Sequence, residues 1–298
     1  MDSISAEARE QVGEGVDIER FVRIFLSACR TRSLQLQNLG LHDLPPALRF
    51  LRPTRLDLSY NDFSTLPSLL FNAFSHSLTS LTVVGNSIEE LPQQLSFCVR
   101  IQRLVLRSNR LRTLPTFIAS LPLIELDVFN NELSIFPMQL ERVKSLRILN
   151  VGRNHLSAPL PSLRSFPNLE RAVFCSNKIS TLVGFFSSEG FNVQYLDVSG
   201  NRLTSISSEI KGGKKLEELL LRNNALKTVP IEVVRLPSLR VLSLFGNPLE
   251  GPFGRVASSM EKTMSFLSVL REELKREAIV QKRHAGSALP HKVDNDFE

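Results

Sequence analysis

The sequence has few cysteines, no tryptophan and only two tyrosines among its 298 residues. The three cysteines, Cys29, Cys98 and Cys175, stand far apart, without the close spacing of zinc ligands and without a cluster at either end. Secreted domains commonly stabilise their ends with disulfides. The pattern therefore favours a reducing compartment and a chain without a structural metal.

Apolar stretches of the length that spans a membrane are also missing. The opening residues, Met1 to Glu10, are polar and acidic and lack the apolar segment of a signal peptide. No Asn-x-Ser/Thr glycosylation sequon occurs, although asparagine is abundant. We therefore expect a soluble protein of the cytoplasm, and a nuclear location stays open.

Residue clusters that carry out catalysis are missing as well. The loop Lys211-Gly212-Gly213-Lys214-Lys215 has the glycines of a phosphate-binding loop but neither its full spacing nor its Ser/Thr. No histidine accompanies Cys175 as a general base. The five histidines are widely spaced: His42, His76, His155, His284 and His291. We expect no enzymatic activity, no cofactor and no metal.

What fills the sequence instead is one pattern, repeated about every 23 residues. Leucines alternate with other residues, an asparagine follows, and in most copies a Leu-Pro pair comes next, as in Leu104, Leu106, Asn109 and Leu114. Successive asparagines are 25, 23, 22, 23, 23, 24, 23 and 23 residues apart. They are Asn61, Asn86, Asn109, Asn131, Asn154, Asn177, Asn201, Asn224 and Asn247. A degenerate copy with Leu39 at the asparagine position precedes them, so the chain holds ten repeats.

The chemistry of this pattern predicts a solenoid. Alternating leucines form a short strand with one buried face, and stacked copies form a parallel sheet. After each strand the chain has to turn, which leaves backbone N–H and C=O groups inside the molecule. Because an asparagine amide both donates and accepts, a buried ladder of asparagines can bond these groups in every repeat. Apolar residues after the Leu-Pro pairs predict short helical or irregular segments on the other side.

The consensus Leu-x-x-Leu-x-Leu-x-x-Asn-x-Leu-x-x-Leu-Pro resembles the leucine-rich-repeat family over about Thr31 to Gly251. Its period resembles the intracellular Leu-Pro branch, that of the Ras-suppressor and plant Ras-group proteins. The resemblance implies an α/β solenoid, a horseshoe with a concave parallel sheet, an irregular or short-helical convex side and helical caps. It also implies a non-enzymatic scaffold or adaptor in intracellular signalling. The partner would be a protein, by resemblance of the small-GTPase or phosphatase class.

Both ends of the array have helical patterns. An apolar stripe between Asp17 and Arg30 predicts a helix that caps the first repeat or, alternatively, binds a partner. Ser258 and Glu261 have capping-box spacing, and the apolar stripe that follows favours a second cap over a coiled coil. We expect an N-terminal segment with a capping helix at 1–30, ten repeats at 31–251, a C-terminal capping helix at 252–284 and a disordered tail at 285–298.

Residues between and just after the core leucines are expected to point out of the concave sheet in columns. In the central repeats, arginines surround an aromatic residue, as in interaction hot spots. Residues 100–171 also hold eleven Lys/Arg against five Asp/Glu. We therefore expect a partner with an acidic surface to bind eight residues: Arg103, Val105, Arg107, Asp127, Phe129, Asn150, Arg153 and Arg171. The convex side or a cap is the alternative site.

Two other functions stay open at this point. The net charge of +6 permits association with nucleic acid, although Glu125 and Asp127 interrupt the central arginines and little aromatic surface is present for stacking. The 47 residues after the array are too few for a catalytic domain. An enzymatic role would therefore belong to a separate enzyme of which this chain is a regulatory subunit.

Overall fold

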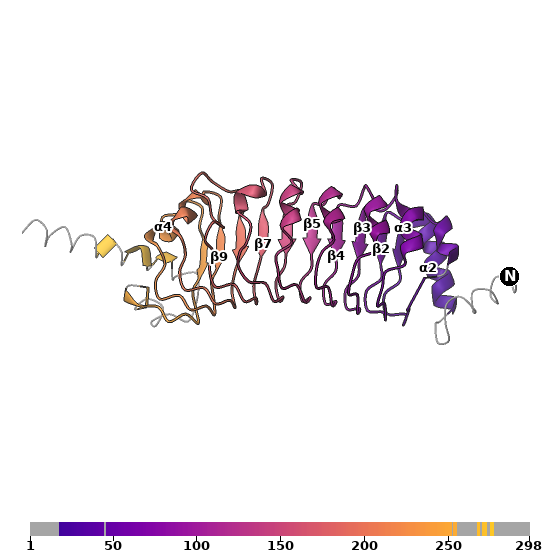
Figure 1. Cartoon of the computed structure of the whole chain (residues 1–298), viewed down its shortest axis with the longest axis horizontal. Coiled ribbons are helices and arrows are strands. Elements are labelled where there is room, and N and C mark those ends of the chain that lie inside the picture. The colour runs from indigo at the N-terminus through magenta and orange to yellow at the C-terminus, as the bar shows by residue number, and fades with distance from the viewer. Residues whose placement is uncertain are drawn as a thin grey trace, which may run out of the picture.

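Ten short parallel strands form one open sheet that runs the length of the molecule (Figure 1). The computed structural model describes residues 18–44, 46–251, 253–254, 267–268, 270–272 and 275–276. Neighbouring strands follow each other in chain order, one from each repeat. They are β1 (Ser33–Gln35), β2 (Arg55–Asp57), β3 (Ser80–Thr82), β4 (Arg103–Val105), β5 (Glu125–Asp127), β6 (Ile148–Asn150), β7 (Arg171–Val173), β8 (Tyr195–Asp197), β9 (Glu218–Leu220) and β10 (Val241–Ser243). This arrangement confirms the predicted α/β solenoid with a parallel sheet.

Short helices form a second row alongside the strands, and several neighbouring helices pack against one another, among them α3 with η2 and η3 with η4 (Figure 1). The α-helices are α2 (Ile18–Thr31), α3 (Ser68–Phe74) and α4 (Ile231–Val234), and the 3₁₀ helices are η1 (Pro46–Phe50), η2 (Gln93–Phe97), η3 (Thr116–Ser120), η4 (Met138–Arg142), η5 (Leu163–Ser165) and η6 (Ser208–Gly212). The proline of a Leu-Pro pair stands one residue before the helix, as Pro92 does before η2 and Pro115 before η3. Its fixed φ suits the extended turn into the helix, and it lacks the N–H that a helix start would leave unbonded.

The chain between β7 and β8 forms turns instead of a helix, in the stretch where the sequence pattern lapses. Aromatic rings fill the space there. Phe174 stacks on Phe136 at 6.0 Å and meets the edge of Phe185 at 5.4 Å, and Phe186 continues the chain of contacts. Large rings in offset or edge-on contact bury more area than the leucines they replace, so the core remains closed without a regular helix.

The leucines at the middle of the strands build the core. Leu81, Leu104, Leu126 and Leu149 are partners in register on β3 to β6, and all four are fully buried. Each buried leucine stabilises the fold by roughly 1.5–3 kcal/mol relative to an exposed one. Because strands stack about 4.8 Å apart, one leucine per repeat gives a continuous apolar column.

The asparagine ladder joins each repeat to the one before it. In the fifth repeat the Asn131 amide donates to Val128 O of its own turn at 3.0 Å and to Leu106 O of the preceding repeat at 2.9 Å. Its Oδ1 accepts the Leu111 N–H at 3.0 Å. The same pattern recurs at Asn109, Asn154, Asn177, Asn201 and Asn224, all buried, while Asn86 and Asn247 are half-buried. One side chain thus replaces the backbone partners that each turn lacks.

A left-handed residue stands directly before every asparagine of the ladder and before Leu39, its counterpart in the first repeat. The ten residues at this position, all with positive φ, are Asn38, Tyr60, Gly85, Ser108, Asn130, Arg153, Ser176, Gly200, Asn223 and Gly246. Each turn needs this backbone to aim the asparagine inward, and the N–H of the residue bonds the next repeat, as Asn130 N–H does to Gly152 O at 2.9 Å. Non-glycine residues pay a steric cost there that the surrounding hydrogen bonds offset.

At the N-terminal end α2 packs on the first repeat, with Ala28 buried and Ile24 and Phe25 half-buried against the core. At the other end Leu267 and Leu270 are buried, and the Arg271 guanidinium donates to three carbonyls between the end of α4 and the start of β10, including Val234 O at 3.1 Å. The predicted helix start at Ser258 and Glu261, the segment 1–17 and the tail from 285 lie outside the described residues. The four-segment division therefore stays a prediction.

We expect Asn131→Ala to lower the free energy of unfolding by roughly 1–3 kcal/mol, because it leaves Leu106 O, Val128 O and Leu111 N–H buried without partners. Urea denaturation followed by circular dichroism measures the change. The control is Asn168→Ala, which removes one exposed bond to Lys144 O. Equal losses in the two variants would contradict the ladder's role.

Candidate protein-binding surface on the sheet

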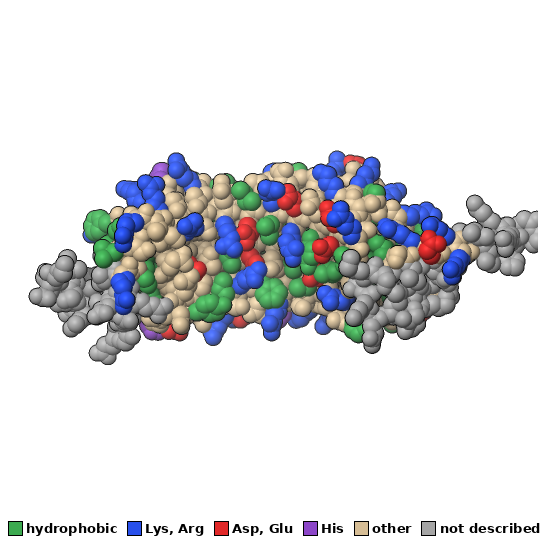
Figure 2. All heavy atoms as spheres, turned by 180° about the vertical axis from the view of Figure 1, so that it is seen from behind, with side chains coloured by type: hydrophobic (Ala, Val, Ile, Leu, Met, Phe, Trp, Pro, Cys, Tyr) green, Lys and Arg blue, Asp and Glu red, His purple; other side chains and the backbone are tan. Residues whose placement is uncertain are grey.

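The side chains on the strands that point away from the core form a surface that we call the sheet face. It consists of three columns. Two of them hold the residues on either side of the core leucine of each strand, such as Arg103 and Val105 on β4. The third holds the residue two positions after the end of the strand, such as Arg107. On the face of the molecule in Figure 2, basic and acidic side chains intermix with hydrophobic ones along the middle of the array.

Asp127 is the centre of the most connected part of the sheet face. The carboxylate is buried, and its Oδ2 accepts the Arg107 Nε–H at 2.6 Å and the Asn150 amide at 3.3 Å. Its Oδ1 accepts the Phe129 N–H at 3.1 Å. A buried carboxylate needs such partners, and several charge-assisted bonds to one group hold the donors in fixed positions. We call Arg107, Asp127, Phe129 and Asn150 the Asp127 cluster.

The Phe129 ring is held on both sides. The Arg107 guanidinium lies 6.0 Å from its centroid, at the limit of a cation–π contact. On the other side, a Cβ added to Gly152 would lie 3.0 Å from the ring and 2.9 Å from Cys175 Sγ. The ring therefore occupies the space that the missing side chain of Gly152 leaves free. Its half-exposed position is set before any partner binds.

The bond from a side-chain oxygen to the N–H two residues later recurs at other strand ends. Asp57 accepts from the Ser59 N–H at 3.0 Å, Asn150 from Gly152 at 3.1 Å and Asp197 from Ser199 at 2.9 Å. The backbone N–H groups of the residues before and after this one donate to carbonyls of the next repeat. The N–H between them therefore points outward and donates to the nearby side-chain oxygen. Asp and Asn at these positions therefore hold the turn that follows the strand, while their side chains remain partly accessible to solvent.

Several arginines of the central repeats are already paired. Arg103 binds Glu125 at 2.8 Å on the adjacent strand, and Arg147 binds Glu170 at 2.6 Å. Arg171 lies flat over the Tyr195 ring, 3.5 Å from its centroid. Burial, followed by the charge of Asp197, raises the pKa of Tyr195, so the phenol stays neutral under Arg171. The central excess of positive charge is therefore partly neutralised within the protein itself.

The eight predicted binding residues all lie on or beside β4 to β7, and six of them have accessible side chains. Val105 and Asp127 differ from the expectation that they point into solvent, since both are buried. Val173, Leu220 and Ser243, in the same column, are buried too. Asp57, Thr82, Asn150 and Asp197 of this column are half-buried, so the middle column is the most buried of the three.

The sequence pattern did not predict the role of three residues of this surface: Glu125 as the partner of Arg103, Gly152 under the Phe129 ring, and Tyr195. The signal for Tyr195 was present. It stands six residues before Asn201, as Arg171 does before Asn177, and the two are register partners on β7 and β8. Register alone would have placed the two side chains together.

Cys175 lies half-buried beside the Asp127 cluster, but its thiol is not activated. Burial, followed by the charge of Asp197, raises the pKa of this thiol to about 11. Burial raises the pKa of the Cys98 thiol to about 12. A nucleophilic thiol needs a lowered pKa, so Cys175 and Cys98 act as packed side chains and not as nucleophiles. Within the described part of the chain, no three His, Cys, Asp or Glu side chains gather where they could hold a metal ion.

A family model described as leucine rich repeat matches residues 191–249. The chain is similar to Tsukushi of Gallus gallus, with 28% identity over 65% of this chain and 47% of that protein. It is also similar to the adenylate cyclase of Schizosaccharomyces pombe, with 27% identity over 83% of this chain and 17% of that one. The chain thus spans less than half the length of either relative.

Among solved structures, the fold is similar to the LRR ectodomain of the plant membrane receptor kinase GASSHO1/SCHENGEN3 from Arabidopsis thaliana, in complex with Casparian strip integrity factor 2. The TM-score is 0.57, with 28% identity, over 73% of this chain and 27% of that one. No helix within the described residues is long and apolar enough to cross a membrane. The Leu-Pro branch within the family stays a prediction.

We expect Asp127→Asn to lower the free energy of unfolding by about 1–3 kcal/mol, because an amide nitrogen would face the Arg107 and Asn150 donors. Denaturation with urea measures it. Glu132→Gln is the matched control, since its ion pair with Arg112 is largely exposed and is worth less than about 1 kcal/mol. A loss no larger than that of the control would show that the Asp127 cluster is not held by its carboxylate.

We expect iodoacetamide to alkylate Cys175 slowly at pH 8, because with a pKa of about 11 only about 0.1% of this thiol is ionised there. Mass spectrometry of timed samples gives the rate, with the exposed Cys29 as an internal comparison. Asp197→Asn removes a charge that raises this pKa and should move the rate profile of Cys175 to lower pH. Rapid modification of Cys175 at neutral pH would contradict the assignment.

Proposed function

We propose that this leucine-rich-repeat solenoid is a non-enzymatic scaffold or adaptor that binds a partner protein on its sheet face. The Asp127 cluster is the observation that carries the proposal, because Arg107, Phe129 and Asn150 are held in place in the free protein. Fixed aromatic and arginine side chains lose little conformational entropy on binding and often dominate interfaces. Leucine-rich repeats generally serve as protein-interaction modules, which supports the same function.

The charges of the sheet face support a partner with carboxylates placed around an apolar side chain. Arg103 and Arg107 are paired but still half-exposed, and a guanidinium has further N–H groups to donate. Arg153 and Arg171 are exposed on the neighbouring repeats. An apolar group of the partner would contact Phe129 between them. By the resemblance to the Leu-Pro branch, the partner belongs to the small-GTPase or phosphatase class.

We include an intracellular signalling role and a cytoplasmic location in the proposal. Cys29, Cys98 and Cys175 are free thiols, which persist best in a reducing compartment. The similarity to a receptor ectodomain favours an extracellular location as the alternative. Fluorescence microscopy of the tagged full-length protein, with compartment markers, distinguishes the two.

We expect Arg107→Gln combined with Phe129→Ser to weaken partner binding at least about tenfold. Glutamine is preferable to glutamate at 107, because a second carboxylate would stand against buried Asp127 and could unfold the protein. Partners are first identified by cross-linking and affinity capture from native cells with the wild-type chain. Binding of each purified partner is then titrated by calorimetry against both forms.

The control is a matched double variant outside the sheet face, Arg142→Gln with Ile135→Ser, which changes one exposed arginine and one exposed apolar residue. Circular dichroism establishes that both double variants stay folded. Equal affinity for wild type and the Arg107/Phe129 variant would contradict the proposal. Nuclease treatment that abolishes capture, with a steep salt dependence, would favour nucleic-acid association instead.

A further inference from the structure

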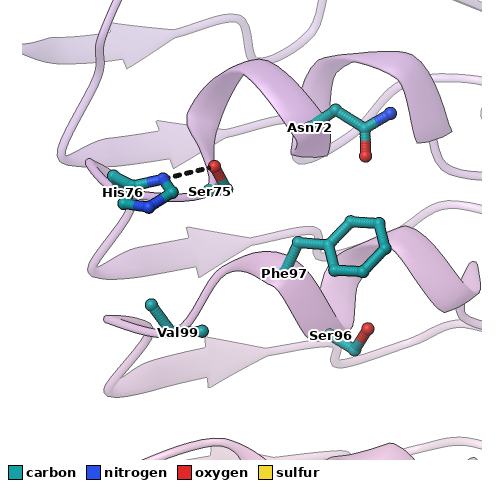
Figure 3. Close-up of a pocket in the computed structure, with 6 residues that line it drawn as sticks. All are labelled: Asn72, Ser75, His76, Ser96, Phe97 and Val99. Carbon is teal, nitrogen blue, oxygen red and sulfur yellow. Dashed lines mark hydrogen bonds between the residues drawn. The ribbon is translucent and has the colours of Figure 1, made fainter.

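A groove lies on the helical side of the solenoid, away from the sheet face, between α3 of one repeat and η2 of the next (Figure 3). It has a volume of about 430 Å³ and is lined by Asn72, Ser75, His76, Ser96, Phe97 and Val99. This volume falls in the range of protein sites that accept a small ligand or a few side chains. The neighbouring helices pack closely, so the two walls of the groove are held together by the core.

Two large apolar side chains of the groove are exposed. Phe97 is 52% and Val99 57% accessible. Phe97 is the last residue of η2, as the exposed Phe50 is of η1, while the last residue of η3 is Ser120 and that of η4 is Arg142. The repeat therefore does not require an aromatic residue here. In Figure 3 the Phe97 ring lies between the ribbons of α3 and η2 and extends to the same side as the Asn72 side chain.

The polar groups of the groove can bond an extended peptide. Ser75 Oγ lies 2.7 Å from His76 Nδ1, which orients the imidazole ring. With the hydroxyl as donor, Nε2 carries the hydrogen and is free to donate to a ligand oxygen. The exposed Asn72 amide supplies both a donor and an acceptor, as a peptide unit needs.

One basic residue directly follows the lining of the groove. Residues 63–88, which include α3, contain no Asp or Glu, and the exposed Glu89 and Glu90 precede η2 at its other end. Arg100 follows Val99 directly and is exposed. No ion pair involves Arg100 within the described residues, whereas Arg103, three residues further along the chain, already binds Glu125. A ligand carboxylate beside Phe97 and Val99 would therefore meet an available guanidinium.

We propose that this groove binds an extended segment of a partner protein, with a large apolar side chain against Phe97 and Val99 and an adjacent Asp or Glu on Arg100. His76 and Asn72 donate to oxygens of the same segment. The groove shares no residue with the sheet face, so the solenoid has two separate binding surfaces. The proposal is independent of the function assigned to the sheet face.

A random-peptide phage library selected on the full chain tests this groove. Each round is first depleted on immobilised Phe97→Ser, which removes peptides that bind elsewhere. We expect the enriched sequences to place an apolar residue next to Asp or Glu. Fluorescence anisotropy of the synthesised peptides should show affinity at least about tenfold lower for Phe97→Ser and for Arg100→Glu than for wild type.

The matched controls are Ile135→Ser and Arg142→Glu. They change an exposed apolar residue and an exposed arginine outside the groove, and should alter the affinity less than about twofold. The Arg107→Gln/Phe129→Ser variant should bind the peptides normally, which separates this test from that of the sheet face. Failure to enrich a sequence, a basic consensus, or unchanged affinity in Arg100→Glu would overturn the proposal. Sedimentation showing a dimer that Phe97→Ser abolishes would also overturn it, because the occupant would then be a second copy of the chain.

Discussion

The buried asparagine of each repeat is the contact on which the rest of the solenoid depends. Each strand has only three residues, so the backbone bonds between two repeats are few. Asn131 adds bonds to its own turn and to both a donor and an acceptor of the preceding repeat. Because every repeat contacts mainly its neighbours, the asparagine bonds between adjacent repeats also set the register of the whole sheet, one repeat at a time.

The register created by the ladder is what turns single residues into surfaces. Residues at one position of successive repeats stand side by side, so Arg103 finds Glu125 and Arg171 finds Tyr195 although each pair is more than twenty residues apart in the chain. These contacts partly neutralise the arginines and also hold them still. A partner therefore meets side chains that are already oriented, and its own carboxylates compete with internal ones.

The two proposed surfaces lie where the repeat imposes no residue type. Phe129 and Phe97 are not required for the strand or the 3₁₀ helix that carries them, and both keep accessible ring surface. They differ in how they are held. Phe129 is held in place by the Asp127 cluster and packs over the small residue Gly152, whereas Phe97 lines a groove between two packed helices.

The periodic leucines and asparagines were sufficient to predict the solenoid, the number of strands and the ladder, because they supply buried apolar groups and backbone hydrogen-bond partners at the same point of every repeat. Tertiary structure alone decided that Asp127 is a buried acceptor and not an exposed binding residue, and that Arg153 occupies a left-handed turn. It alone decided that Tyr195 lies under Arg171 and that α3 and η2 leave a groove. These features depend on side chains brought together from different repeats, and a local pattern carries no information about which neighbour covers, pairs with or orients a given residue.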